Sequence, residues 1–426
     1  MNCSIISIGT ELSLGIVTDS NSTYIAEKLS ELGIECNYMF TVPDNKKEIC
    51  NVLRIGLDHS DIIIISGGLG PTDDDMTREA VAEAIGKSLI KDKKLVPTSL
   101  KFIKRKRTKE VNKRLLRQSY IPDGSVPIIP KIGSASGFRI DIGDNNHIFC
   151  IPGVPKEMVN MFKEDLMPFL KKLIGLEASC NTGTRIRKTT LLTTDISETE
   201  IEEKIKDLVC EAKKNSINIG ITATPGLIKI ILIEKSNPGV IETENLKSFE
   251  QKISSRLGSF VYGKGKALIS DNLKTTIENT GREITISAAE SITGGLISSI
   301  ITDTSGSSIY FKGAVVSYSE FAKEKVLDID KRLVRSKGAV SKEICKEMAI
   351  KVMRLFESDY SLSVTGFAGP EDEGNDLGLV YCCIRGPSGY QEVFEKRFLG
   401  DRTEIKFRTT QFVLNELINV IKKLER

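Results

Sequence analysis

The sequence predicts an α/β protein of three parts: an amino-terminal doubly wound domain, a small α+β middle unit and a carboxy-terminal α/β domain. The chain has 426 residues, enough for two to four domains at about 150 residues each. Its first part alternates short apolar runs with stretches of helical periodicity, which is typical of βαβ units. The pattern changes near residue 171, and strand and helix alternate again after residue 262. We therefore expect domains at 1–170, 171–262 and 263–426.

The amino-terminal part begins with three strands joined by helices. Cys3–Ile8 is an apolar strand, and the apolar residues of Asn21–Leu32 recur at helical spacing before Gly33 ends the helix. A strand over Ile34–Val42 and a second helix follow. The third strand, Asp61–Ser66, is a nearly continuous apolar run, as in a central parallel strand covered on both faces. Right-handed crossovers between such strands predict a doubly wound sheet.

The other two parts follow the same reasoning. In the middle part we expect a helix over 198–212 and strands over 189–194, 218–224 and 228–234, with Gly263–Lys266 as the exit linker. In the last part we expect strands over 283–288, 313–318, 360–365 and 379–385, and helices over 296–301, 342–356 and the end of the chain.

Composition argues against several classes of partner. Lys and Arg number 60 against 57 Asp and Glu, so the net charge of +3 creates no strong field toward nucleic acid or an anionic membrane. The basic stretch 101–117 is most simply a solvated helix. No apolar run approaches the roughly 18 residues of a membrane span, and Met1–Gly9 lacks the pattern of a signal peptide. We expect a cytoplasmic protein without nucleic-acid or membrane partners.

Histidine and cysteine usage narrows the chemistry. The nine Cys are nowhere spaced as CxxC, which argues against structural zinc and against a disulfide framework. The two His are His59 and His147, and none follows. A hydrolytic site in the last domain must therefore use a base other than imidazole.

A glycine-rich loop follows the third strand and predicts a phosphate site. Gly67, Gly68 and Gly70 lack the Cβ atoms that would keep a ligand from backbone N–H groups, and a helix begins behind them. The adjacent Asp triplet exceeds what a helix cap needs, and a divalent metal would relieve its mutual repulsion. We expect metal ligands at Asp73, Asp74 and Asp75.

The first two βα junctions place more polar residues at the same sheet edge, because ligands bind outside the carboxyl ends of parallel strands. For Asp19 and Asn21, helix capping is an equally good interpretation. The expected nucleotide-binding residues of this domain are Gly9, Glu11, Asn21, Asp44, Gly67, Gly68, Gly70 and Asp75.

In the last domain, Ser291 lies between a predicted strand and a predicted helix, ahead of Gly294 and Gly295. Such a turn presents a hydroxyl beside free backbone N–H groups, a layout that stabilises an oxyanion. From spacing alone, an ordinary N-cap by Ser291 or Thr293 is the simpler interpretation. Small-residue turns near Gly338 and in Thr365–Gly369 indicate that several loops form one pocket.

Lysine is the base that remains for this pocket. Lys323 and Lys325 follow the strand that ends at Tyr318. A free Lys has a pKa of about 10.4, so a dry pocket must lower it by about three units for a base near neutral pH. Because most Lys side chains are solvated, position alone selects neither residue.

Five motifs, in order along the chain, resemble those of the CinA (competence/damage-inducible protein A) family: Ile8–Glu11, Asp19–Asn21, Gly67–Thr77, Gly133–Phe138 and Ile151–Met158. The resemblance implies that the amino-terminal domain has the molybdopterin-binding fold of molybdenum-cofactor biosynthesis proteins. It implies hydrolysis of ADP-ribose to AMP and ribose 5-phosphate with a divalent metal (Mg, Mn or Co), using Asp44 and Asp75. Family members usually have Asn, Thr and Pro where this chain has Pro130, Ser134 and Ser136.

The carboxy-terminal domain resembles the family's nicotinamide mononucleotide deamidase, which uses a Ser/Lys pair and no cofactor. The resemblance implies Ser291 as nucleophile, Lys323 as base and Tyr318 as a third catalytic residue, and Ile292 stands where many members have Cys. Arg402 is a candidate for the substrate phosphate, with pairing to Asp401 or Glu404 an equal alternative. The expected substrate contacts are Thr293, Gly294, Gly295, Gly338, Thr365, Gly366, Gly369 and Arg402.

We therefore expect a bifunctional enzyme of pyridine nucleotide metabolism whose partners are small nucleotides. One alternative is a deamidase whose first domain only binds a nucleotide or pterin. Another is a non-catalytic factor for DNA uptake or recombination. We also expect a homodimer, for which edge strands of the middle unit offer a route by sheet extension.

Overall fold

The computed structural model describes residues 1–96, 116–143, 146–175, 185–224, 226–236, 244–369 and 377–425. The predicted basic helix over 101–117 lies almost wholly outside these residues. The chain forms two compact units: Met1–Arg187 with Lys235–Glu242, and Lys188–Glu234 with Thr243–Arg426. Among the described residues, no helix combines the length and hydrophobicity that a membrane crossing requires.

The first unit is built on a six-stranded sheet with the order β2-β1-β3-β8-β7-β6. The first four strands of this order are parallel, and the last two are antiparallel additions at one edge. The strands are β1 (Asn2–Ile8), β2 (Glu35–Val42), β3 (Ile62–Ser66), β6 (Val126–Ile128), β7 (Gly137–Ile142) and β8 (Asn146–Ile151). A separate pair is formed by β4 (Leu89–Lys91) and β5 (Tyr120–Pro122).

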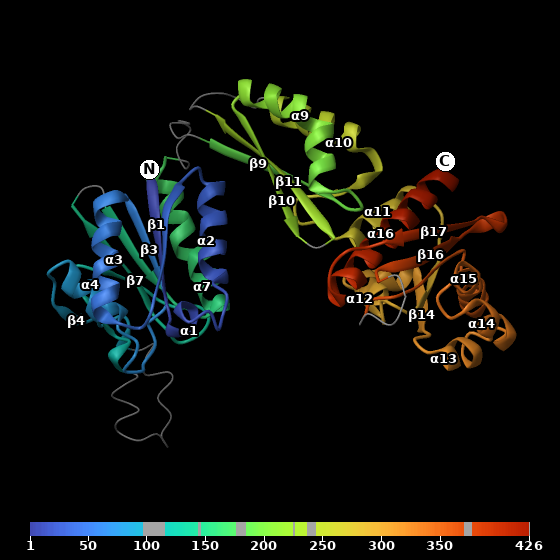
Figure 1. Ribbon diagram of the computed structural model, residues 1–426. Coiled ribbons are helices and arrows are strands. Elements are labelled where there is room, and N and C mark those ends of the chain that lie inside the picture. Colours follow the sequence, from blue (N-terminus) through green and yellow to red (C-terminus); the bar gives the residue numbers. More distant parts are fainter. Residues whose placement is uncertain are drawn as a thin grey trace, which may run out of the picture. The chain divides into compact units, whose positions relative to one another are not determined.

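Helices cover both faces of this sheet, as Figure 1 shows for α2 and α7 on one side and α3 and α4 on the other. Each face has its own core of buried apolar side chains, mainly Ile and Leu. The helices are α1 (Thr10–Ser13), α2 (Ser20–Glu31), α3 (Lys46–His59), α4 (Thr77–Ala84), α7 (Pro155–Met161) and α8 (Met167–Leu173). The predicted doubly wound domain is confirmed, and β3 is an interior strand whose five residues are all buried.

The second unit begins with a βαββαβ segment, whose strand order β10-β11-β9-β12 is that of a ferredoxin-like sheet. Its elements are β9 (Arg185–Thr193), α9 (Glu198–Lys214), β10 (Ile217–Thr224), β11 (Leu227–Ser236), α10 (Glu244–Leu257) and β12 (Val261–Lys264). The linker prediction at Gly263–Lys266 is wrong for its first half, because Gly263 and Lys264 pair with β9. Helix α10 was not predicted, although Phe249, Ile253 and Leu257 bury one face.

The rest of this unit is a five-stranded sheet with the order β14-β13-β15-β16-β17. Its strands are β13 (Ile286–Glu290), β14 (Phe311–Val316), β15 (Tyr360–Gly366), β16 (Leu379–Arg385) and β17 (Gln391–Arg397). The principal helices are α11 (Ile269–Asn279), α12 (Leu296–Thr302), α13 (Glu320–Lys325), α14 (Lys331–Lys337), α15 (Lys342–Phe356) and α16 (Arg402–Leu424). The strand predicted over 283–288 starts and ends later, at Glu290, which puts Ser291 directly at its carboxyl end.

The ferredoxin-like segment packs on this sheet domain within the second unit. Leu192 joins the core that contains α11 and α16 side chains, with Leu227 packed against it. The Lys396 ammonium donates to the Asp195 carboxylate at 2.8 Å. Both apolar and charged contacts therefore fix the segment against the sheet.

Candidate functional site

Ser291 is held by the sheet itself. Its N–H donates to the Val364 carbonyl at 3.0 Å, which continues the pairing of β13 with β15 by one residue. The chain then turns through Gly294 and Gly295, which have φ values of 60° and 99°, into α12. A side chain would strain this left-handed backbone. The turn therefore fixes a nearly buried hydroxyl at the carboxyl end of a central parallel strand.

The Lys323 ammonium lies 2.9 Å from the Ser291 hydroxyl oxygen. It also donates to the Ser317 carbonyl at 2.8 Å, so two contacts orient the amine. Lys323 is 1% exposed, whereas Lys325 on the same helix is exposed. Burial lowers the pKa of Lys323 to about 8. The structure therefore distinguishes the two Lys and brings Ser291 and Lys323 together.

Glu290 organises the turn that follows Ser291, and this role of Glu290 was not predicted. Its fully buried carboxylate accepts the N–H groups of Gly295, Ile297 and Ser298 at 2.8, 3.1 and 2.9 Å. It also accepts the hydroxyls of Thr293 and Ser298. Neither Ser291 nor Thr293 caps α12, so the simpler N-cap interpretation is wrong. The available signal was an acid directly before a glycine-rich helix start, where orphan N–H groups need an acceptor.

The backbone donors differ from those predicted for the oxyanion. Gly294 donates its N–H to the Ser291 carbonyl at 3.1 Å, and Gly295 donates to Glu290. The N–H groups of these two glycines are therefore not free to stabilise an oxyanion, because they already have partners. Within the described chain, the N–H groups of Ile292 and Thr293 donate to no other residue. They are the pair beside Ser291 that is able to stabilise developing negative charge.

The other predicted loops join at this end of the sheet. The buried Thr365 hydroxyl donates to the Ala339 carbonyl at 3.0 Å, which links β15 to the turn after Gly338. Gly366 leaves no room for a Cβ, which would collide with the Leu379 carbonyl and crowd Ile292. Its small size is thus required by packing beside the Ser291 turn.

Arg402 lies at the start of α16 and connects two more predicted residues. Its guanidinium donates to the Gly369 carbonyl at 2.7 Å and to the Tyr318 hydroxyl. Asp401 and Glu404 form a capping box with each other instead of pairing with Arg402. Tyr318 is 59% exposed, and its hydroxyl contacts Arg402 and neither member of the Ser291–Lys323 pair. Tyr318 thus contacts Arg402, and its predicted catalytic role stays a prediction.

The first unit has a cavity of about 570 Å³ at the carboxyl ends of its parallel strands. All eight residues predicted to bind a nucleotide there line it: Gly9, Glu11, Asn21, Asp44, Gly67, Gly68, Gly70 and Asp75. Asn21 donates to the Ser66 hydroxyl and the Gly153 carbonyl, at 3.1 and 2.7 Å. Asp19 caps α2 through the Ser22 N–H. Asp19 is therefore a helix cap, whereas Asn21 bridges the cavity wall, and its binding of a nucleotide stays a prediction.

At two glycines of this cavity, neighbouring atoms of the chain itself leave no room for a side chain. A Cβ on Gly67, at φ 108°, would collide with the Ile8 carbonyl, and one on Gly68, at φ 62°, would collide with the Thr77 hydroxyl. Both residues also have left-handed backbone. The loop thus requires glycine in order to pack between β1 and α4, whether or not a phosphate approaches it.

The Asp triplet does not form the predicted metal site. Asp75 accepts the N–H groups of Gly70 and Thr72, both at 2.8 Å, and so closes its own loop. Asp73 pairs with Arg117 at 3.0 Å. Across the described ranges, no three His, Cys, Asp or Glu side chains gather as metal ligands. Asp73, Asp74 and Asp75 therefore do not form the joint ligand set that we predicted, because Asp73 and Asp75 are held by different partners.

The cavity wall is nevertheless acidic. Its described lining residues include no Lys or Arg. They include six carboxylate residues: Glu11, Asp19, Asp44, Asp74, Asp75 and Glu157. Asp44 accepts the N–H and hydroxyl of Thr10 at 2.8 and 2.9 Å. Of the positions where the chain departs from the usual family residues, Ser134 lines the cavity. Ser136 is buried, with no hydroxyl partner in the described chain.

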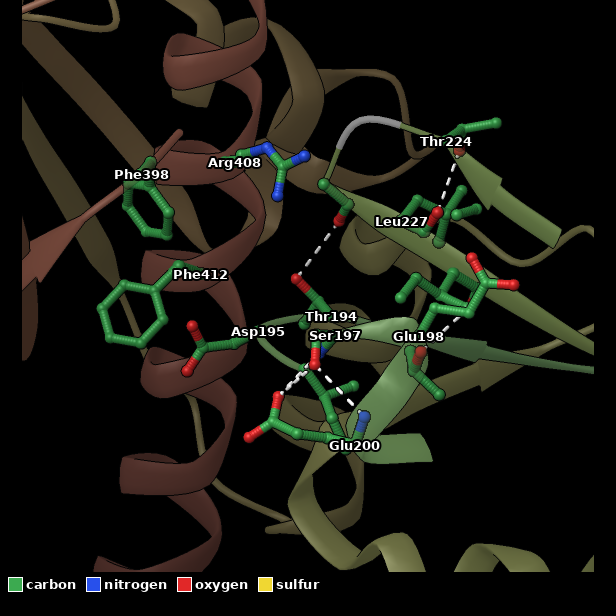
Figure 2. A pocket seen from close by; sticks show the side chains of 15 residues that line it. Thr194, Asp195, Ser197, Glu198, Glu200, Thr224, Leu227, Phe398, Arg408 and Phe412 are labelled. Carbon is green, nitrogen blue, oxygen red and sulfur yellow. Dashed lines mark hydrogen bonds between the residues drawn. The ribbon is translucent and has the colours of Figure 1, made fainter. Parts of the chain in front are cut away.

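A second cavity, of about 360 Å³, lies between the ferredoxin-like segment and α16 in the second unit. Figure 2 shows the Arg408 guanidinium extending from α16 toward β11, with Phe398 and Phe412 beside it. Two of the acids that line the cavity have partners elsewhere, because Asp195 pairs with Lys396 and Glu200 forms a capping box with Ser197. No residue predicted for catalysis lines this cavity.

Comparison with known proteins agrees with the three-part organisation. Residues 4–172 match the probable molybdopterin binding domain, 188–263 the damage-inducible protein CinA KH domain, and 270–421 the CinA C-terminal domain. A protein of Halothermothrix orenii that carries the name competence-damage inducible protein is 37% identical over 99% of both chains. The chain belongs to the CinA family.

Other family members extend the comparison. A Bacillus subtilis protein with the same name is 35% identical over 98% of both chains. Among solved structures, the protein CinA from Thermoplasma acidophilum is 34% identical and covers 38% of this chain and 94% of its own, with a TM-score of 0.36. Membership rests on the full-length relatives.

The segment that matches the CinA KH domain differs in one loop from KH domains that bind nucleic acid. KH domains that bind nucleic acid clamp its backbone with a GxxG loop. No two glycines in 188–263 are three residues apart in this chain. The segment therefore lacks the residues of that clamp.

Proposed function

We propose that the carboxy-terminal domain is an amide hydrolase that converts nicotinamide mononucleotide to nicotinic acid mononucleotide and ammonia. The observation that carries the proposal is the 2.9 Å contact between the Lys323 amine and the Ser291 hydroxyl. A buried amine with a pKa of about 8 is partly uncharged near neutral pH, and only the uncharged form accepts a proton. No imidazole is available in this part of the chain.

The reaction follows from these groups in two halves. Uncharged Lys323 takes the Ser291 proton while the serine oxygen attacks the carboxamide carbon, and the carbonyl oxygen becomes an oxyanion at the N–H groups of Ile292 and Thr293. The Lys323 ammonium then protonates the departing nitrogen, the C–N bond breaks, and ammonia leaves an acyl-serine. Water attacks this ester with Lys323 again as base, and the acid product and free Ser291 result. No cofactor is needed for either half.

The direct test is ammonia release from nicotinamide mononucleotide by wild-type protein and the Ser291→Ala variant. We expect release by the wild type and none above background by the variant. Equal rates for both proteins would contradict the proposal. A protein that binds DNA with steep salt dependence, yet releases no ammonia, would instead support the non-catalytic alternative.

For the amino-terminal domain we propose a nucleotide site, with hydrolysis of ADP-ribose to AMP and ribose 5-phosphate as its activity. Support comes from the cavity that all eight expected residues line. Because its walls are acidic, a phosphate bound there needs an accompanying cation, for which Mg, Mn or Co is the expected choice. Since the Asp triplet does not converge, we assign no ligand set and no step to that metal.

The test is AMP release from ADP-ribose with each metal and with chelator. Metal-dependent release supports the second activity. Binding of ADP-ribose without cleavage would instead support the alternative in which this domain only binds its nucleotide or pterin.

A further inference from the structure

The helix end nearest Ser291 has no capacity left for a substrate phosphate. Glu290 already accepts the N–H groups of Gly295, Ile297 and Ser298 at the start of α12. A phosphate at this helix end would meet a buried carboxylate in place of free donors. If the substrate is a mononucleotide, side chains elsewhere must bind its phosphate.

Lys406, on α16, is placed for that task. A Cβ built on Gly294 would lie 3.8 Å from the Lys406 ammonium, the only heavy atom that it would meet within 4 Å outside its own chain neighbours. Lys406 is partly buried. In the described part of the chain, its ammonium forms no hydrogen bond or ion pair. An uncompensated positive charge therefore stands beside the turn that carries the proposed nucleophile.

A second uncompensated charge lies one helical turn earlier. Arg402 precedes Lys406 by four residues, so both side chains emerge from the same face of α16. Among the residues that the structure describes, the guanidinium of Arg402 contacts two neutral acceptors, the Gly369 carbonyl and the Tyr318 hydroxyl. The two acids of this turn, Asp401 and Glu404, satisfy each other's backbone N–H groups at 3.0 and 2.9 Å. Two cations on one helix face that have no carboxylate partner among the described residues are suited to a phosphate dianion.

We propose that Lys406 binds the phosphate of the substrate and, with Arg402, makes the site selective for the phosphorylated nucleotide over its nucleoside. This inference rests on the proposed amidase function and adds a specificity residue to it. Lys406 acts as a point charge that needs no fixed geometry, whereas Arg402 is oriented by Tyr318 and Gly369.

The kinetic test compares nicotinamide mononucleotide with nicotinamide riboside, which lacks the phosphate. For Lys406→Ala, and for Lys406→Met with its apolar stem retained, we expect KM for the mononucleotide to rise about 10- to 100-fold. We expect kcat to stay near the wild-type value, riboside turnover to be unchanged, and Lys406→Arg to restore most of the affinity. An equal loss on both substrates, or an unchanged KM, would overturn the proposal.

Arg408→Ala is the matched control. Arg408 lies on the same helix two residues later, but it lines the separate cavity shown in Figure 2. Its removal takes away the same charge and leaves the Ser291 turn untouched. We expect wild-type kinetics on both substrates. A KM increase equal to that of Lys406→Ala would mean that only net charge matters, and would overturn a specific role for Lys406.

A binding measurement separates this inference from the proposed reaction. Calorimetry on Ser291→Ala and on Ser291→Ala/Lys406→Ala, with nicotinic acid mononucleotide and its riboside as probes, requires no turnover. We expect the second substitution to weaken mononucleotide binding alone. If wild-type protein released no ammonia, the amidase proposal would fail, and equal mononucleotide affinity in these two proteins would overturn the role of Lys406 independently.

Discussion

The two candidate sites occupy equivalent places in their sheets but differ in solvent and charge. Each lies at the carboxyl ends of parallel strands. In the carboxy-terminal domain a buried amine contacts a buried hydroxyl, with Lys323 1% and Ser291 7% exposed. In the amino-terminal domain an acidic cavity of about 570 Å³ holds carboxylates that mostly bind their own loops. The first arrangement brings a candidate base and a candidate nucleophile together, whereas the second is a binding cavity whose chemistry depends on its ligand.

This difference teaches that residue type alone does not identify a catalytic group. Asp75 and Lys323 are both charged residues in motifs of the same family. Asp75 accepts two backbone N–H groups and stabilises a loop. Burial disfavours the charged form of Lys323, so a fraction of the amine is uncharged near neutral pH and available as a base.

The largest expected effect comes from removing the nucleophile. Ser291→Ala should reduce ammonia release by roughly 10³- to 10⁶-fold, because members of a catalytic unit fail together. AMP release from ADP-ribose, if present, should be unchanged, since that cavity belongs to the other unit. Coupled assays of both products on one preparation check this. A parallel loss of both activities would contradict the separation of the two sites.

The pH dependence of amidase turnover should follow the protonation of Lys323. With a pKa of about 8, kcat/KM should rise about tenfold per pH unit between roughly pH 6.5 and 8 and level off above it. Steady-state rates across this range are the measurement. A flat profile in wild-type protein would show that an uncharged amine is not required.

The sequence predicted the parallel strands better than it predicted the contacts around Ser291 and Lys323. Apolar runs such as β3 are local signals, and so they are readable without coordinates. The contact between Ser291 and Lys323 spans 32 residues, and neither periodicity nor spacing contains it; the family resemblance supplied it. Strand β17 was not predicted, and its residues are half-buried or exposed, with none fully buried.

The features that the sequence did not reveal have a common physical cause. Glycines and aspartates that suggested ligand binding also make contacts within the chain, such as Gly68 against Thr77. Such close approaches depend on tertiary packing. The role of Glu290 was missed because its five donors become neighbours only after the turn has formed.

A smaller effect is expected on the free energy of unfolding, because burying the Lys323 ammonium destabilises the folded protein. Lys323→Met should raise the free energy of unfolding at neutral pH by about 1–3 kcal/mol, because the folded protein no longer buries an ammonium. The folded pKa of Lys323 lies below its unfolded value of about 10.4, so the unfolded state binds more protons between these values. The gain should therefore be constant below pH 8 and vanish toward pH 10.4. Denaturant unfolding at several pH values checks it, with exposed Lys325→Met as the control that should show no gain.

The smallest effect distinguishes a structural from a ligand-binding Asp75. Asp75→Asn replaces an acceptor of two backbone N–H groups, so the first unit should lose about 1–2 kcal/mol of stability. Asp74→Asn, at an exposed position of the same loop, should lose none. Thermal unfolding with amidase assays checks both variants. An Asp75→Asn protein of unchanged stability that no longer binds ADP-ribose would show that Asp75 serves the ligand instead of the loop.

The claim that an uncharged Lys323 activates Ser291 is tested most directly by the rate at which an acylating probe modifies the hydroxyl. Mass spectrometry would follow acylation of Ser291 between pH 6 and 10 in wild-type and Lys323→Met proteins. We predict a wild-type rate that rises about tenfold per pH unit up to about pH 8 and then levels off, and negligible modification of the variant. Equal acylation rates in the two proteins, or a wild-type rate independent of pH, would contradict it.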